Sequence, residues 1–348
     1  MIVDAIRKVA GGEVLTQAEA AEAMEAIMTG EATPAQIAAL VTALRLRGER
    51  EEEVAGFAQT MRRHAVPVAL SLQDPVVDNC GTGGDGARTF NISTAAAFVV
   101  AGAGVPVAKH GNRAMSSHSG SADVLEALGV RIDLGPDAVA RCVQEVGIGF
   151  MFAPRFHPAM RHAAPVRREI GIRTVFNVLG PLTNPAGVRH QLIGVAMPDL
   201  VEIVARVLAL LGTEHALVVY SGDGLDELSL GAPNRVYEVR ANGSTTVHQF
   251  TLEAAELGLT PVASEAVRGG SAAENAALIR RVLQGEPGPA REITLLNAAA
   301  ALYAADSASS LGEGLLLAAR SIDSGAALAR LEALIELSNR LIEAEVQV

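Results

Sequence analysis

The glycines and polar residues between positions 76 and 94 have the types and spacing of a phosphate site. The segment reads VVDNCGTGGDGARTFNIST and places four glycines within the six positions 81–86. A β-branched run before them predicts a strand, and Ser93 and Thr94 after them begin a predicted alanine-rich helix. Glycine lets a backbone approach a ligand closely, and the N–H groups of a helix N-terminus favour an anion. The segment therefore predicts a phosphate cradle, whereas an ordinary tight turn would explain only two of the glycines.

Two nucleotide-binding patterns fit this segment poorly. The spacing G-x-G-x-x-G matches the dinucleotide fingerprint, but that motif needs an acidic residue about 20 positions later. The chain has Lys109 and His110 near that point, and no Gly-Lys-Ser/Thr follows the glycines as a Walker loop requires. A carboxylate at Asp85 would repel phosphate unless a cation or a sugar hydroxyl lay between them. The loop therefore suits a phosphorylated sugar with a divalent metal better than a bare nucleotide.

Polar loops also follow later predicted strands. The segment 109–113, KHGNR, supplies cations, and 116–121, SSHSGS, supplies hydroxyls and a helix cap. Asp226 and Glu227 are adjacent after a glycine-rich turn. Mg²⁺ prefers one or two carboxylates together with substrate phosphates, so these two are predicted metal ligands. A solvated acidic turn would be an equal alternative if the phosphate loops were absent.

The pattern of apolar residues predicts how these loops are positioned. Residues 1–65 are predicted to be helical, with capping boxes at Thr16 and Thr33. From Pro67 onward, short apolar strands alternate with helices, which indicates a mostly parallel sheet covered on both faces. Ligands of such sheets bind at the carboxyl ends of the strands, where the glycines lie. The predicted strands are 76–79, 105–108, 130–133, 149–152, 192–196 and 216–220. The predicted helices between them are 94–103, 122–128, 137–145 and 200–211.

Two segments depart from this alternation. Residues 154–190 form a proline-rich excursion with several basic residues, among them His157, Arg167 and Arg173, and one arginine there could hold a carboxylate bidentately. The Asn242-Gly243 pair predicts a hairpin within residues 235–250. Three helices are predicted after it, at 271–284, 291–305 and 325–344.

Composition excludes several classes of protein. The net charge of −11 argues against a nucleic-acid or anionic-membrane partner. Cys80 and Cys142 have neither the number nor the spacing of a disulfide framework or a zinc site, so two reduced thiols are predicted. The N-terminus lacks the pattern of a signal peptide, and the most apolar run, 95–108, is too short to span a bilayer. A cytoplasmic protein is the expectation.

Six ordered motifs together resemble the anthranilate phosphoribosyltransferase family. They are GTGGDG at 81–86, NIST at 91–94, KHGNR at 109–113, SSHSGSAD at 116–123, VRREIGIRTVFNVLGPLTNPA at 166–186 and DGLDEL at 223–228. The resemblance implies an α/β fold of the nucleoside phosphorylase/phosphoribosyltransferase type. A small all-helical domain, residues 1–66 with part of 160–190, would join a larger α/β domain, residues 67–348, with a mostly parallel central sheet.

The resemblance also implies the reaction and its residues. The family transfers the 5-phosphoribosyl group from 5-phosphoribosyl 1-diphosphate to the amine of anthranilate, releases diphosphate, and serves tryptophan biosynthesis. The implied donor-binding residues are Gly81, Gly84, Asp85, Thr89, Asn91, Ile92, Ser93, Thr94, Lys109, His110, Gly111, Asn112, Arg113, Ser116, Ser117 and Ser121. The implied anthranilate-binding residues are Gly81, Asn112, Arg167, His110, His157 and Pro181. The implied Mg²⁺ ligands are Ser93, Asp226 and Glu227, and Lys109 and His110 are the catalytic candidates. A homodimer formed through the helical domain is expected.

Two alternatives belong to other functional classes. A pyrimidine nucleoside phosphorylase shares the fold and a phosphate loop, but would lack the KHGNR and DGLDEL pair. A catalytically silent relative that binds nucleic acid would need a basic surface, against which the net charge of −11 argues.

Overall fold

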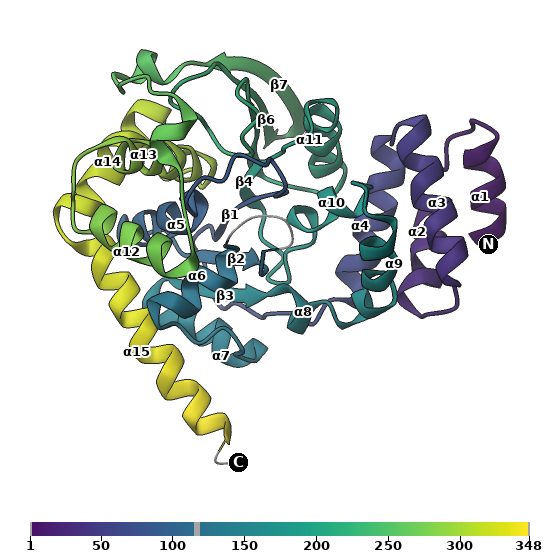
Figure 1. Ribbon diagram of the computed structural model, residues 1–348, viewed down its shortest axis with the longest axis horizontal. Coiled ribbons are helices and arrows are strands. Elements are labelled where there is room, and N and C mark those ends of the chain that lie inside the picture. Colours follow the sequence, from purple (N-terminus) through teal and green to yellow (C-terminus); the bar gives the residue numbers. More distant parts are fainter. Residues whose placement is uncertain (1, 115–118, 347–348) are drawn as a thin grey trace.

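The protein consists of a helical part at one end and a helix-flanked sheet at the other (Figure 1). The structure, a computed structural model, describes residues 2–114 and 119–346. The helical part contains α1 (Ile2–Ala10), α2 (Gln17–Met28), α3 (Pro34–Arg47) and α4 (Glu51–His64). Among the described residues, no helix combines the length and the apolar character needed to cross a bilayer.

Local sequence signals begin and end these helices as predicted. The hydroxyl of Thr16 accepts the N–H of Glu19 at 3.2 Å, and the Glu19 carboxylate accepts the N–H of Thr16 at 2.7 Å. Thr33 and Gln36 form the same capping box at the start of α3, and Gly48 ends that helix with a φ of 90°. Each box satisfies N–H groups that a helix N-terminus otherwise leaves without partners.

The described residues form one sheet of seven strands in the order β3-β2-β1-β4-β5-β6-β7. Strands β1 to β5 are parallel, and β6 and β7 form the predicted antiparallel hairpin. This confirms the predicted fold class. The strands are β1 (Val77–Gly81), β2 (Val107–Gly111), β3 (Ile148–Phe152), β4 (His190–Gly194), β5 (His215–Ser221), β6 (Asn234–Asn242) and β7 (Ser244–Leu252). The strand order reverses between β1 and β4, which makes the carboxyl ends of these two strands the topological switch point of the sheet.

The sheet separates two hydrophobic cores. Along β5, Leu217 and Val219 belong to one core, whereas Ala216 and Val218 belong to the other. A strand buried on both faces must be apolar throughout, which explains the continuous run of apolar residues in β5. The first core is completed by α5 (Ile92–Gly102), α6 (Ser121–Leu128), α7 (Pro136–Arg141), η1 (Cys142–Val146), α12 (Ala272–Leu283), α13 (Pro289–Ala304), α14 (Leu311–Asp323) and α15 (Ala326–Val346).

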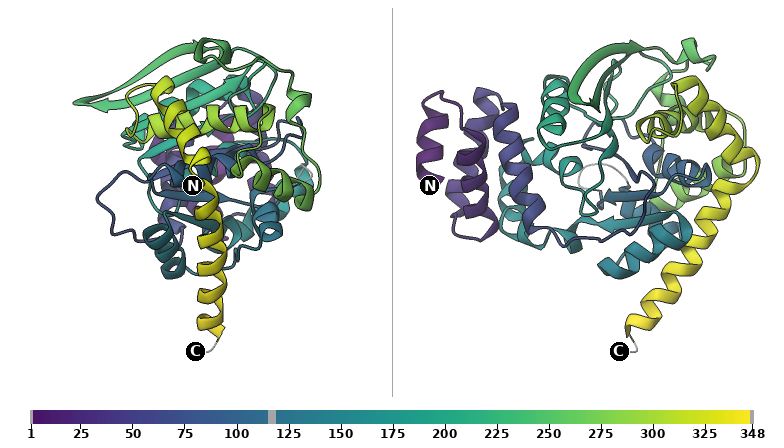
Figure 2. Two further views of the ribbon diagram at one scale, coloured as in Figure 1. Left: turned by 90° about the vertical axis from the view of Figure 1, so that its left-hand side faces the viewer. Right: turned by 180° about the vertical axis from the view of Figure 1, so that it is seen from behind.

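The second core joins the helical part to the sheet and to the proline-rich excursion. It contains residues of α1 to α4, of α11 (Val201–Leu210) and of the excursion helices α9 (Ala164–Ile170) and α10 (Phe176–Leu179). A short helix, α8 (Ala153–Phe156), leads from β3 into the excursion. Figure 2 shows the helical part at the end of the molecule opposite α15. The excursion therefore lies between the helical part and the strand ends.

Two predictions about elements were wrong. Residues 130–133 are not a strand, although Val130 and Ile132 are buried and alternate with exposed positions. This extended segment packs on α15 instead, where the N–H of Arg131 donates to the Ser338 hydroxyl at 3.1 Å. When buried and exposed residues alternate, one side of an extended segment is buried. A helix can cover that side as well as a neighbouring strand can. The helix α14, between two of the predicted C-terminal helices, was not predicted at all.

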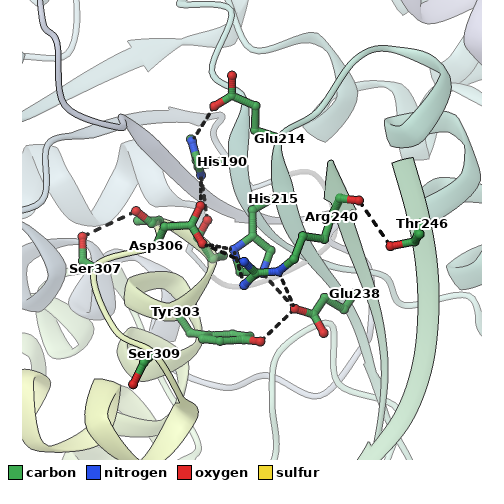
Figure 3. Close-up of polar contacts among 12 residues, drawn as sticks. His190, Glu214, His215, Glu238, Arg240, Thr246, Tyr303, Asp306, Ser307 and Ser309 are labelled. Atoms are coloured by element: carbon green, nitrogen blue, oxygen red, sulfur yellow. Dashed lines mark hydrogen bonds and ion pairs between the residues drawn. The ribbon is translucent and has the colours of Figure 1, made fainter. Parts of the chain in front are cut away.

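A cluster of charged side chains fastens β5 and β6 to the end of α13 (Figure 3). The two ring nitrogens of His215 lie 2.9 Å from Asp306 Oδ1 and 3.2 Å from Glu238 Oε1. The Tyr303 hydroxyl donates to Glu238 at 2.8 Å, and Arg240 pairs with Glu238 at 3.2 Å and with Asp306 at 3.3 Å. Hydrogen bonding from His215, followed by that from Tyr303 and Arg240, lowers the pKa of Glu238 to about 2 despite its burial.

Glu238 is expected to make stability depend on pH in acid. Its folded-state pKa lies below the ordinary value of 4.5, so its contribution is present above about pH 4.5 and is lost as pH falls toward about 2. The wild-type protein should lose unfolding free energy between pH 5 and pH 3. We predict that Glu238→Gln loses about 1 to 2 kcal/mol less than wild type over this range. Urea unfolding at both pH values measures this, with Glu22→Gln, at an exposed position on α2, as control. An equal change in unfolding free energy between the two pH values for wild type and Glu238→Gln would contradict this role of Glu238.

Candidate functional site

The candidate site lies where the carboxyl ends of the parallel strands meet. The glycine loop, residues 81–86, follows β1, and the described loop residues 111–114 and 119–121 follow β2. The turn 222–228 follows β5, and the excursion 153–189 connects β3 to β4. Four loops distant in sequence therefore converge on the switch point between β1 and β4.

Asp226 occupies the space between the ends of β1 and β4. Its carboxylate Oδ2 accepts the N–H of Gly83 at 2.6 Å. A Cβ at Gly81 would lie 2.1 Å from that same oxygen, and a Cβ at Gly194 would lie 1.6 Å from the backbone oxygen of Asp226. Gly194 therefore has to be glycine to admit the acidic turn, whereas a side chain at Gly81 would displace the Asp226 carboxylate. Sequence reasoning assigned Gly81 to the ligand alone and missed Gly194, whose signal was a glycine in the middle of the predicted strand 192–196.

Glu227 lies beside the N-terminus of α5. Its Oε1 accepts the N–H of Ser93 at 3.1 Å, and the side-chain amide of Asn79 donates to the backbone oxygen of Ser93 at 2.8 Å. The structure thus brings Ser93 and Glu227 into contact and places Asp226 next in the chain. Sequence reasoning found these three residues but not Asn79, which fixes the start of the helix against β1.

The acidic groups of this site oppose one another. Burial raises the pKa of Glu227 to about 7, and the charge on Asp85 contributes in the same direction. Burial, with the charges of Asp85 and Glu227, also raises the pKa of Asp226 well above its ordinary value. A bound divalent cation would offset this repulsion, so the residues fit such an ion. Within residues 2–114 and 119–346, no three His, Cys, Asp or Glu side chains are placed to hold a metal ion by themselves. Ser93 or a bound ligand would therefore have to supply further oxygens.

Lys109 on β2 and Asp78 on β1 are both buried. The Lys109 ammonium donates to the backbone oxygen of Asn79 and lies 3.4 Å from its side-chain oxygen. Asp78 accepts the N–H of His110 at 3.3 Å and the side-chain amide of Asn184 at 2.8 Å. Burial raises the pKa of Asp78, and the Lys109 charge opposes that rise. Sequence reasoning missed Asp78 and Asn184, which tie the excursion to the strand ends.

Two neutral histidines line the excursion side of the site. The rings of His110 and His157 lie 5.0 Å apart, and burial lowers their pKa values to about 3 and about 4. The Nδ1 of His110 is 3.3 Å from the carbonyl oxygen of Gly180, which can only accept, so Nδ1 carries the proton. The Nε2 atoms of both rings are buried without a hydrogen-bond partner among the described residues. Buried polar atoms are normally satisfied, so these two nitrogens fit a ligand that donates hydrogen bonds.

Arg167 lies in the same excursion and has no ion-pair partner in the described part of the chain. Its guanidinium lies 5.4 Å from the ring centre of Phe176, and burial lowers its pKa. Pro181 is buried, and its carbonyl oxygen accepts the side-chain amide of Gln191 at 2.9 Å. A half-buried arginine without a carboxylate partner is suited to bind an anionic ligand.

The loop after β2 is organised by Asp123, which sequence reasoning missed. Its Oδ2 accepts the N–H groups of Ala114 and Gly120, both at 2.9 Å. Arg113 pairs with Asp123 at 3.0 Å and with Glu126, so its charge is already balanced. The predicted residues Gly111, Asn112 and Ser121 pack closely in this loop. A Cβ at Gly111 would lie 2.2 Å from Ser121 Oγ. The Ser121 hydroxyl donates to the Asn112 carbonyl oxygen at 3.3 Å. The predicted residues Ser116 and Ser117 lie outside the described residues.

The remaining predicted donor residues lie on or after the glycine loop. Ile92 and Thr94 are buried, and the Thr94 hydroxyl has no hydrogen-bond partner among the described residues. The Asn91 side chain donates to the backbone oxygen of Ser119 at 3.0 Å and accepts from Asn275 at 2.9 Å. Gly84 lies beneath the guanidinium of Arg173. The Asp85 carboxylate accepts the N–H of Ala87 at 3.1 Å. Thr89 forms an isolated antiparallel β-bridge with Arg268.

A second hollow, of about 460 Å³, lies beside the charged cluster of Figure 3. It is lined by Arg240, Tyr303, Asp306, Ser307, Ala308, Ser309 and Glu313. Arg240 and Asp306 pair with each other, and Ser309 donates to Glu313 at 2.6 Å. His215 marks the amino end of β5, so this hollow lies away from the glycine loop. Because its charged groups satisfy one another, the site at the carboxyl ends of the strands is the better candidate.

Known proteins resemble this chain over nearly its full length. Residues 3–65 match the glycosyl transferase family helical bundle domain, and residues 73–328 match the a/b domain of that family. A Thermomicrobium roseum protein named anthranilate phosphoribosyltransferase is 72% identical, with 99% of each chain covered. One from Roseiflexus sp. is 60% identical, with 97% of this chain and 98% of the relative covered.

Solved structures give the same result. Anthranilate phosphoribosyltransferase from Thermus thermophilus is 48% identical with a TM-score of 0.91, covering 97% of this chain and 99% of that one. The Saccharomyces cerevisiae enzyme, solved in complex with PRPP and Mg, is 29% identical with a TM-score of 0.88, covering 98% of each chain.

The close approach of Asp226 to β4 is testable through Gly194. A methyl group there would overlap the Asp226 backbone, which cannot rotate away as a side chain could. We predict that Gly194→Ala lowers the unfolding free energy by about 2 to 4 kcal/mol in chemical denaturation. Gly312→Ala, on the exposed side of α14 with its nearest atom at 3.9 Å, is the control and should not lower stability. Equal stability of the two variants would refute the packing argument.

Proposed function

Because the chain belongs to the anthranilate phosphoribosyltransferase family, we propose that it transfers the 5-phosphoribosyl group from 5-phosphoribosyl 1-diphosphate to the amine of anthranilate. The products are N-(5-phosphoribosyl)anthranilate and diphosphate, and the reaction belongs to tryptophan biosynthesis. The observation that carries the proposal is the arrangement at the switch point. The glycine loop contacts Asp226, Ser93 contacts Glu227, and the neighbouring excursion supplies Arg167, which has no ion-pair partner among the described residues.

The donor binds at the glycine loop. Backbone N–H groups of this loop and of the N-terminus of α5 would bind its phosphates, and Ser93, Asp226 and Glu227 would hold Mg²⁺. When bound, Mg²⁺ neutralises charge on the diphosphate as it leaves. The mutual repulsion of Asp85, Asp226 and Glu227 supports a cation at this position.

The acceptor binds on the excursion side. Arg167 holds the anthranilate carboxylate, Asn112 and Pro181 line its route, and the Nε2 atoms of His110 and His157 accept hydrogen bonds from the amine. An aromatic amine is neutral at pH 7, so it needs orientation more than a strong base. The low pKa values of both histidines keep them as neutral acceptors throughout the physiological range.

Some residues of the site stabilise charge on the leaving group, and others position the acceptor. The bond from the anomeric carbon to diphosphate breaks with oxocarbenium character, so the site must stabilise the leaving group and hold the nucleophile opposite to it. Backbone N–H groups and the buried ammonium of Lys109 serve the first need. Arg167 and the two histidines serve the second.

The rival functions have less support. The relatives at 72% and 60% identity are named anthranilate phosphoribosyltransferase, not nucleoside phosphorylase. The net charge of −11 opposes a nucleic-acid surface. Three further points remain predictions. They are a homodimer, a cytoplasmic location, and the division into a helical domain (residues 1–66 with part of 160–190) and an α/β domain (residues 67–348).

Anthranilate fluorescence tests the proposed function directly. We expect emission to decay when protein, 5-phosphoribosyl 1-diphosphate and Mg²⁺ are all present, and to stay constant when any one is omitted. The chain contains no tryptophan, so its own emission interferes little. A constant signal in the complete mixture would refute the function.

Arg167→Ala is predicted to raise the KM for anthranilate about tenfold or more, because the carboxylate loses its charged partner. The KM for the donor should stay near the wild-type value. Steady-state kinetics with each substrate varied in turn measures both constants. Arg168→Ala, at the exposed neighbouring position, is the control. An equal rise in both KM values would contradict the acceptor role.

Asp226→Asn combined with Glu227→Gln is predicted to shift the Mg²⁺ dependence of activity to about tenfold higher concentration or more. The amide oxygens can still accept from Gly83 and Ser93, so the loops should keep their positions while the charges are lost. A Mg²⁺ titration of activity measures the shift, and Asp199→Asn, at an exposed position before α11, is the control. An unchanged titration would remove both carboxylates from the metal site.

A further inference from the structure

Arg173 extends over the glycine loop from the excursion. A Cβ built on Gly84 would lie 3.4 Å from Arg173 Nη2, 3.5 Å from Nε and 3.6 Å from Cζ. Three guanidinium atoms at nearly equal distance indicate that the planar group lies against the Gly84 backbone. The side chain is exposed, and it has no hydrogen bond or ion pair within residues 2–114 and 119–346. An unpaired guanidinium therefore lies at the phosphate cradle.

Two other basic side chains near this edge, those of Lys109 and Arg113, are already engaged. Lys109 is buried and donates to both oxygens of Asn79. Arg113 pairs with Asp123 and Glu126 on α6. The three acids of the site, Asp85, Asp226 and Glu227, meanwhile bring negative charge to the glycine loop. Arg173 adds an unpaired side-chain cation at this loop, where the acids oppose the negative charge of a bound diphosphate.

The local fold directs Arg173 toward the loop. The helix α9 ends at Gly171, whose φ of 68° turns the chain. Thr174 is buried, and its N–H donates to the side-chain oxygen of Asn177 at 3.0 Å. Arg173 therefore lies on a short link that is fixed at both ends. Arg167 lies on α9, and Arg173 follows that helix. The two arginines consequently serve different parts of one site.

We propose that Arg173 is a further binding residue of the donor, and that its guanidinium holds oxygens of the diphosphate at the glycine loop. This inference rests on the proposed function and deepens it, since it assigns part of the donor contact to the excursion that also holds the acceptor. A planar fork can donate two parallel hydrogen bonds to a phosphate group, which a single ammonium cannot. The donor would then bridge the two sides of the site.

Calorimetric titration of the full-length protein tests the proposal without turnover. The probes are 5-phosphoribosyl 1-diphosphate with Mg²⁺ and inorganic diphosphate with Mg²⁺, both in the absence of anthranilate. We expect Arg173→Ala to weaken binding of both probes about tenfold or more, and Arg173→Lys to fall between Arg173→Ala and wild type. Arg168→Ala is the matched control and should bind both probes like wild type. Thermal unfolding of each variant should match wild type, because Arg173 is exposed.

Kinetics separates this role from a structural one. Arg173→Ala should raise the KM for the donor while the KM for anthranilate stays near wild type, the opposite of the pattern expected for Arg167→Ala. Donor affinity within about twofold of wild type in Arg173→Ala would overturn the inference and leave the proposed function intact. Weaker donor binding with unchanged diphosphate binding would overturn the assignment to diphosphate. Failure of the wild-type protein to consume anthranilate would refute the proposed function itself.

Discussion

The candidate site depends on one close approach, that of Asp226 to the ends of β1 and β4. A Cβ at Gly194 would overlap the Asp226 backbone, and a Cβ at Gly81 would displace the Asp226 carboxylate, because the acidic turn occupies that space. This packing holds the glycine loop through the Gly83 N–H and brings Glu227 to the N-terminus of α5. The glycines of such a loop can therefore serve two purposes, since they admit both a ligand and the segment that carries the proposed metal ligands.

Charge balance in the site is incomplete without a ligand. Asp78 and Glu227 are buried around the Lys109 ammonium, and Asp226 lies under the glycine loop with Asp85 nearby. Burial raises the pKa values of these carboxyl groups, and repulsion among Asp85, Asp226 and Glu227 adds to the rise at Asp226 and Glu227; a divalent cation would favour their charged forms. Buried charges of this kind are arranged for a function more often than for stability. The cluster around His215 shows the contrast, because its acids and bases neutralise one another.

The division of the molecule into two cores explains how both substrates could meet. The excursion packs in the same core as the N-terminal helices, yet Asn184 ties it to β1 and β2 through Asp78 and the Ala108 carbonyl oxygen. Arg167 and Arg173 are thereby presented to the strand ends by the side of the molecule that carries the helical part. A site built across two packed units also gains specificity from the distance between its halves.

The sequence by itself determined the elements and most of the candidate residues. Capping boxes, glycine ends and the Asn-Gly turn are local signals, because they act within a few residues of the chain. Only the tertiary structure decided which loops meet. Residues 130–133 have a strand-like pattern but pack on α15, and the need for glycine at 194 arises from Asp226, which follows only after α11 and β5 along the chain. Asp78, Asp123 and Asn184 were missed for the same reason, since a buried polar residue takes its role from partners that only folding brings close.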